Sequence, residues 1–189
     1  MNKKLIILTG HLATGKTTFS IKLSEKLKIP CFNKDYIKEE IGKSIDVKDS
    51  KDSNLIGSIS YDILFYVVDR LMMANVPLII ESCFSSQSIV NIKRLLKKYN
   101  YQVLTFFLTG DLKISHKRFL VRDKTRERND VHKFSNVTNN FSEFLLTQED
   151  KKESNFEFSN KIISIDTTNF EKVNFNKYIQ DAKDFLENN

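Results

Sequence analysis

One glycine-rich segment near the start of the chain restricts its fold more than any other feature. Residues 10–17 read GHLATGKT and match the pattern G-x-x-x-x-G-K-[ST], and the apolar run from Leu5 to Leu8 precedes them. Apolar residues then recur at Phe19, Leu23 and Leu27, which is the spacing of one helix face. A strand, a glycine loop and a helix in this order form a P-loop, whose backbone N–H groups surround phosphate oxygens.

The residue types within this loop have distinct tasks. Lys16 is expected to reach the β- and γ-phosphates of a nucleotide, and the Thr17 hydroxyl is expected to bind Mg²⁺. ATP and Mg²⁺ are therefore the expected cofactors. The predicted nucleotide-binding residues are Gly10, His11, Leu12, Ala13, Thr14, Gly15, Lys16, Thr17 and Thr18.

Strand and helix patterns alternate along the rest of the chain, which is typical of an α/β fold with a parallel sheet. Strands are predicted at residues 4–8, 29–32, 78–81, 102–108 and 161–165, and helices after the first near 35–43, 54–74, 87–99, 111–126 and 175–187. These elements predict a three-layer P-loop NTPase fold, in which helices cover both faces of a five-stranded parallel sheet and add a helical lid. The helix near 54–74 is apolar almost all round, which predicts packing on both sides.

The length of 189 residues suits one domain with a substantial core, so residues 1–189 are expected to form a single kinase-sized unit. No signal peptide pattern opens the chain, and no apolar stretch is long enough to span a bilayer. A cytoplasmic protein without membrane contact is therefore expected. Cys31 and Cys83 are expected to be buried structural thiols.

Two acidic residues follow predicted strands, where open α/β sheets place groups that contact ligands. Asp35 fits two roles, a base or anchor for an attacking hydroxyl, or an N-cap of the helix that follows. Glu81 ends the third strand in the manner of a Walker B acid, which supports Mg²⁺ or its waters. It also fits a contact to a basic lid or substrate group, or a strand end that meets water. The sequence leaves these roles open.

Most of the net charge of +6 lies in one segment, since residues 113–133 hold eight basic and three acidic residues. One local basic cluster favours a specific anionic ligand over a general nucleic-acid or membrane surface. Arg118, Arg122 and Arg126 share one helix face, where like charges repel, and they fit either a triphosphate clamp or a solvated face. His116 is expected to face solvent.

A lid is predicted from about residue 118 to 149, because this stretch is polar and has few apolar residues to bury. We expect it to close when a triphosphate binds, with Arg122 and Arg126 at the phosphates. Arg128 and His132 are then expected to face the acceptor or the adjoining lid, although His132 fits an exposed position equally well.

Four motifs in a fixed order carry a resemblance to a known group. They are the P-loop, NKDYIK at 33–38, IIESCF at 79–84 and the arginine row that ends at His132. Together they resemble the small P-loop kinases of the AAA-domain "predicted kinase" group, which are related to polynucleotide kinase, zeta toxin and chloramphenicol phosphotransferase. The resemblance implies that Lys16 and Thr17 handle phosphates and Mg²⁺ and that Asp35 is a base or substrate anchor. Lys38 stands where polynucleotide kinases carry an arginine, which keeps the charge but loses the planar fork.

The leading hypothesis is an ATP-dependent phosphotransferase that acts on a hydroxyl of an unidentified small molecule. A 5′-hydroxyl polynucleotide kinase and a non-catalytic nucleotide-binding switch are the alternatives. The predicted catalytic residues are Lys16, Asp35, Arg122 and Arg126; the substrate-binding residues are Asp35, Lys38, Glu81, Arg128 and His132; the metal-binding residues are Thr17 and Glu81.

Overall fold

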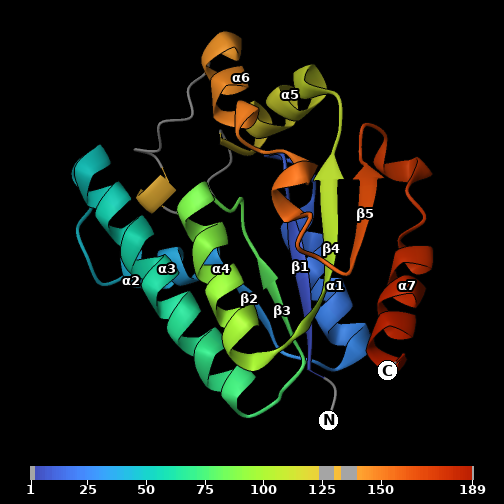
Figure 1. Ribbon diagram of the computed structural model, residues 1–189. Helices are drawn as coiled ribbons and strands as arrows, with labels where there is room; N and C mark the ends of the chain where they lie inside the picture. The colour runs from blue at the N-terminus through green and yellow to red at the C-terminus, as the bar shows by residue number, and fades with distance from the viewer. Residues whose placement is uncertain (1–2, 124–129, 133–139, 189) are drawn as a thin grey trace.

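One sheet of five parallel strands organises the molecule (Figure 1). The computed structural model describes residues 3–123, 130–132 and 140–188. The strand order is β2-β3-β1-β4-β5, and the strands are β1 (Lys4–Gly10), β2 (Cys31–Asn33), β3 (Leu78–Glu81), β4 (Gln102–Thr109) and β5 (Lys161–Asp166). The predicted fold class, a five-stranded parallel P-loop sheet, is confirmed.

Helices cover both faces of this sheet. On one face, α1 (Lys16–Leu27) and α7 (Phe175–Glu187) pack on a core that includes Ile6 and Leu8. On the other face, α3 (Ser50–Met73) and α4 (Ser86–Tyr99) pack on a core that includes Leu5 and Ile7. Successive residues of a strand point to opposite faces, so the uninterrupted apolar run of β1 supplies both cores.

Four further helices lie toward the carboxyl ends of the strands. They are α2 (Lys34–Gly42), which follows β2 directly, α5 (Leu112–Asp123), α6 (Phe141–Glu149) and the short 3₁₀ helix η1 (Asp130–His132). Two more 3₁₀ helices, η2 (Glu153–Phe156) and η3 (Phe170–Lys172), precede and follow β5 in the chain. Figure 1 shows α5 and α6 together beyond the end of β4. No helix in the described part of the chain is long and apolar enough to cross a membrane.

The long helix α3 differs from its prediction in two ways. It begins at Ser50, because the Asp49 side chain caps it by accepting the N–H groups of Lys51 and Asp52. Its outer side exposes large apolar residues, among them Leu55 and Tyr66. The expectation that this helix packs on both sides was therefore wrong.

Helix α6 is absent from the predicted elements, and it changes the surroundings of α5. Its Phe144 is fully buried, with ring centroids 6.0 Å from Phe119 and 4.9 Å from His116. His116 is therefore buried, and the expectation that it faces solvent was wrong. The expected lack of apolar burial in the lid was also wrong for this helix.

The two cysteines are free thiols and are half-buried rather than fully buried. Burial raises the pKa of Cys31 to about 11, which keeps this sulfur protonated near neutral pH. The Cys83 thiol points to the carbonyl of Gly10, with 3.5 Å between Sγ and the oxygen. Cys31 thus begins β2 and Cys83 follows the end of β3, and the two do not form a disulfide with each other.

Candidate active site

The sheet brings the predicted site residues to one edge. Strands β1, β3 and β2 are neighbours, and their register pairs Leu8 with Glu81 and Glu81 with Asn33. Because the strands are parallel, their carboxyl ends meet at the same edge, which is where the P-loop leaves β1. The P-loop, Glu81 and the start of α2 thus share one place in the fold.

Gly10 allows the P-loop to leave the sheet close to β4. Its φ angle is 121°, and a Cβ at this position would lie 2.0 Å from the carbonyl oxygen of Leu108. The next residue, His11, donates its N–H to that same oxygen at 2.9 Å. Only glycine fits this close approach, so the motif's first glycine has a steric reason in the fold.

The loop folds over the side chain of Lys16. The Lys16 Nζ donates to the carbonyl oxygen of His11 at 2.5 Å, and the Thr14 hydroxyl donates to the same carbonyl at 2.8 Å. Lys16 is only 6% exposed, and it is the first residue of α1. Its ammonium therefore stands at a helix N-terminus inside the loop, the place where phosphate oxygens bind in such loops.

Glu81 is the centre of a buried polar network below the P-loop. Its Oε2 accepts from the Thr17 hydroxyl at 3.0 Å and from the Asn33 side-chain amide at 2.8 Å. The same amide nitrogen donates to the Ser20 hydroxyl at 2.7 Å. Burial raises the pKa of Glu81, although Lys16, Asn33 and Thr17 each oppose that rise.

These oxygens suit a hard cation. Mg²⁺ prefers hydroxyl and carboxylate oxygens and keeps several water or phosphate ligands of its own, so it does not need a cluster of carboxylates. Thr17 and Glu81 already contact one another at 3.0 Å. They are the residues that would hold Mg²⁺ next to the P-loop, while Asn33 orients the carboxylate.

Replacing Glu81 with glutamine is expected to raise the melting temperature by about 2–4 °C near pH 7.5, in line with ~1 kcal/mol for a protein of this size. Because burial raises the pKa of Glu81, the folded chain binds more protons than the unfolded chain above the ordinary glutamate pKa. The free energy of unfolding therefore falls as the pH rises above the ordinary glutamate pKa. Glutamine has no proton to lose in this range, so it removes this loss of stability while keeping an acceptor oxygen.

Thermal melts of the wild type and of Glu81→Gln at about pH 4 and about pH 7.5 test this expectation. The difference in melting temperature between the two proteins should be smaller at the lower pH. The matched control is Glu25→Gln, which neutralises an exposed carboxylate on α1. A gain that is largest in acid, or none near neutral pH, would contradict the expected burial effect.

Asp35 lies in the first turn of α2 and is open to solvent. Its side chain is 63% exposed, although nearby protein removes part of its hydration. Burial alone would raise the pKa of Asp35, but Lys34, His132 and Lys16 outweigh this effect and bring it below its ordinary value. Asp35 is therefore an ionised carboxylate at neutral pH.

The alternative role of Asp35 as an N-cap does not match the helix boundary. Asn33 is the N-cap of α2, and its side chain bonds to Glu81 and Ser20 instead of capping the helix. Asp35 is two residues further along, and the bond seen for its carboxylate is to the Lys34 ammonium at 3.2 Å.

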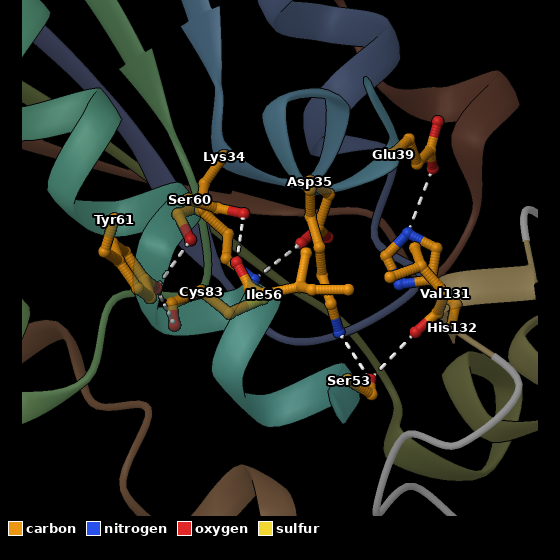
Figure 2. A network of polar contacts seen from close by, with 12 residues as sticks. Lys34, Asp35, Glu39, Ser53, Ile56, Ser60, Tyr61, Cys83, Val131 and His132 are labelled. Atoms are coloured by element: carbon orange, nitrogen blue, oxygen red, sulfur yellow. Dashed lines mark hydrogen bonds and ion pairs between the residues drawn. The ribbon is translucent and has the colours of Figure 1, made fainter. Parts of the chain in front are cut away.

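The Tyr61 ring of α3 faces Lys34, the residue that bonds to the Asp35 carboxylate. The Lys34 ammonium lies 5.3 Å from the centre of the Tyr61 ring, a cation–π distance. The Tyr61 hydroxyl is 2.8 Å from the Ser82 hydroxyl, and burial raises the pKa of Tyr61 to about 12. Figure 2 shows Lys34, Asp35 and Tyr61 near one another between α2 and α3. Neither Lys34 nor Tyr61 is distinguished by its sequence context, because their contact depends on how α3 packs on α2.

The segment η1 attaches to α2 and α3 (Figure 2). The buried Lys38 ammonium donates to the Ser53 hydroxyl at 2.8 Å, and this hydroxyl donates to the Val131 carbonyl at 2.8 Å. The His132 Nε2 lies 3.0 Å from a Glu39 carboxylate oxygen, and burial lowers the pKa of His132. Lys38 therefore helps to hold η1 against α3 through Ser53. His132 lies beside α2, close enough to Asp35 to lower the pKa of that carboxylate.

The Arg118 guanidinium is held by contacts with the segment after β5. Its guanidinium donates to the carbonyl oxygens of Thr167 and Thr168, each at 2.8 Å, and lies 4.0 Å from the centre of the Phe170 ring. A Cβ on Gly15 would lie 3.0 Å from that ring. Arg118 thus connects α5 to the segment after β5. The stacked pair of Arg118 and Phe170 lies beside the P-loop at Gly15.

The other basic residues of the predicted clamp are placed only in part. Arg122 is exposed, and its guanidinium lies 5.9 Å from the centre of the Phe119 ring. Arg126 and Arg128 lie outside the described residues.

Comparisons with known proteins agree with this architecture. Residues 1–163 match the family model described as Zeta toxin. No curated protein matches the chain. A solved structure of a presumed kinase from Chloroflexus aurantiacus aligns with a TM-score of 0.89 at 23% identity, covering 99% of this chain and 100% of that one.

Two more distant structures share the fold. A gluconokinase from Sinorhizobium meliloti aligns with a TM-score of 0.54 at 12% identity, covering 97% of this chain and 91% of that one. A shikimate kinase from Bacteroides thetaiotaomicron aligns with a TM-score of 0.56 at 16% identity, covering 97% and 98%. Identities this low show a common fold only. The family match over most of the chain confirms the resemblance to zeta toxins, and the chain belongs to the zeta toxin family of P-loop kinases.

Proposed function

We propose that this protein transfers the γ-phosphate of ATP to a hydroxyl group of a small molecule. One observation carries the proposal: an ionised, solvent-open carboxylate, Asp35, stands at the same sheet edge as the P-loop and is close enough for Lys16 to lower its pKa. Phosphoryl transfer needs a base for the acceptor hydroxyl near the cradle of the transferred phosphate.

The chain's own groups have separate tasks in this reaction. Lys16 and the loop N–H groups neutralise charge on the phosphates, and Asp35 accepts the proton of the attacking hydroxyl. The hydroxyl oxygen forms the new bond to phosphorus as the bond to the bridging oxygen breaks, and ADP leaves. Mg²⁺, held by Thr17 and Glu81, supplies further neutralisation of phosphate charge when bound.

The surroundings of Asp35 support an acceptor site at this position. Lys34, Tyr61 and His132 offer a cation, an aromatic ring and an imidazole around the carboxylate. We assign the acceptor to this space. Arg122 is exposed on α5, and we propose that it and Arg126 reach the triphosphate while Arg128 faces the acceptor.

The stacked pair beside the P-loop supports a nucleotide as the donor. Arg118 and Phe170 present planar groups next to Gly15, and such groups stack on nucleobases. A small acceptor is favoured over a polynucleotide end because Lys38, at the position of the polynucleotide-kinase arginine, is buried and bonds to Ser53.

A screen for ADP release tests the proposal. Purified protein, ATP and Mg²⁺ are mixed with single hydroxyl compounds (sugars, polyols, nucleosides, hydroxylated amides) or with a 5′-OH oligonucleotide. At least one small compound should raise ADP release above the acceptor-free rate, and Lys16→Ala should remove the increase. Release with the oligonucleotide alone would favour the polynucleotide alternative, and ATP binding without release would favour the switch.

A further inference from the structure

A side chain from α6 binds a backbone group of the P-loop. The Leu12 N–H donates to the Gln148 Oε1 at 3.0 Å, although 136 residues separate the two along the chain. Gln148 is only 3% exposed, and its amide nitrogen donates to the Thr147 hydroxyl at 2.6 Å, which fixes which end of the amide faces Leu12. This contact joins the predicted lid directly to the first half of the loop.

The same contact determines the place of Lys151. The Lys151 N–H donates to the Gln148 carbonyl at 3.0 Å, and its ammonium folds back to the Thr147 carbonyl. Phe144, one turn earlier in α6, is fully buried against α5. Lys151 is therefore held beside the P-loop by a packed helix and by a bond to the loop itself.

Two ammonium groups face this part of the loop. Burial lowers the pKa of Lys151 and repulsion from Lys16 adds to this effect, while attraction to Cys83 and Asp150 opposes it. Burial also lowers the pKa of His11, and repulsion from the same two ammonium groups adds to that effect. None of the ion pairs among the described residues includes the Lys151 ammonium. Two like charges, one on the buried Lys16 and one on the half-buried Lys151, are unfavourable near one another unless an anion lies between them.

We propose that Lys151 is a phosphate-binding residue whose ammonium contacts the γ-phosphate on the side opposite Lys16, with Gln148 as its positioning residue. The γ-phosphate is the matching anion because Gln148 binds the loop at Leu12 and Lys151 follows Gln148 closely in the chain, next to this first half of the loop. The α- and β-phosphates belong to the second half of the loop and to the N-terminus of α1. This inference rests on the nucleotide binding proposed above.

Titration calorimetry with Mg²⁺ and two probes, ADP and a non-hydrolysable ATP analogue, tests the inference. Lys151→Gln should weaken binding of the ATP analogue by about tenfold or more, as expected for a lost charge-assisted hydrogen bond. The same substitution should change the affinity for ADP by less than about twofold. Lys151→Arg keeps the charge and should hold the analogue-to-ADP affinity ratio near that of the wild type. Lys152→Gln, which removes the exposed neighbouring charge, is the matched control.

The ratio of the two affinities separates the outcomes. An equal loss for ADP and the analogue, no loss for either, or the same loss in Lys152→Gln would overturn the role of Lys151. Failure of Lys151→Arg to keep the wild-type ratio would overturn it as well. If the wild type binds neither probe, the proposed function itself fails, and this inference falls with it.

Discussion

Replacing Lys16 with alanine is expected to lower phosphotransfer by about a hundredfold to a thousandfold, as for the loss of one group that stabilises transition-state charge. The Lys16 ammonium donates to the His11 carbonyl inside the P-loop. We expect it to be the cation nearest the phosphates. Affinity for an ATP analogue should also fall. The fold should persist because the apolar residues of α1 that pack on the sheet, Phe19 and Leu23, are unchanged.

Initial rates of ADP formation with an acceptor from the screen, together with thermal melts, measure the effect of Lys16→Ala. Lys22→Ala is the matched control, since it removes an exposed lysine from the same helix. Wild-type turnover in Lys16→Ala would remove the P-loop from the mechanism. A large drop in melting temperature would instead mean that the ammonium supports the loop's fold.

Elements that depend on local sequence were predictable. β3 was expected at residues 78–81 and lies at Leu78–Glu81, and the other strands differ by one or two residues at their ends. A strand buried on both faces of a parallel sheet is a continuous apolar run, which is easily read from the sequence. The P-loop was equally clear because its backbone requires glycine at fixed positions, as the contact of Gly10 with Leu108 shows.

Helix α6 was not predictable from its own residues. Its buried side chains are a phenylalanine and a glutamine, Phe144 and Gln148, so its apolar periodicity is weak. The partners of these two side chains lie far away along the chain, on α5 and at Leu12. Such contacts depend on tertiary packing, which overrides local preference. The misplacement of His116 has the same cause.

For the proposed acceptor site, the sequence predicted where Asp35 lies in the fold but not which residues surround it. Asp35 could be placed at a strand end, but its neighbours depend on how α3 and η1 pack on α2. Asn33 illustrates the limit: its contact with Glu81 requires that β2 and β3 be adjacent, which strand order alone decides. A polar residue at a strand end thus acquires its role from the neighbouring strand.

Replacing Asp35 with asparagine is expected to lower transfer to the acceptor by about 10²- to 10⁴-fold, the usual range for a general base. Asparagine has nearly the same shape, and α2 keeps its own N-cap, Asn33. Nucleotide affinity should therefore stay near the wild-type value, because the contact seen for the Asp35 carboxylate is with Lys34 and not with the loop. A loss confined to turnover is what separates a base from a structural residue.

The pH dependence of the wild type adds a second measurement for Asp35. Because Lys34, His132 and Lys16 bring the pKa of Asp35 below its ordinary value, the carboxylate stays ionised until the pH falls below that value. The rate should therefore begin to fall in acid only below the ordinary aspartate pKa, and Asp35→Asn should abolish this acid limb. Glu40→Gln, which neutralises an exposed carboxylate on the same helix, should change neither the rate nor the profile. Transfer by Asp35→Asn within about tenfold of the wild type, less than the smallest usual general-base effect, would mean that Asp35 anchors Lys34 and that another group takes the proton.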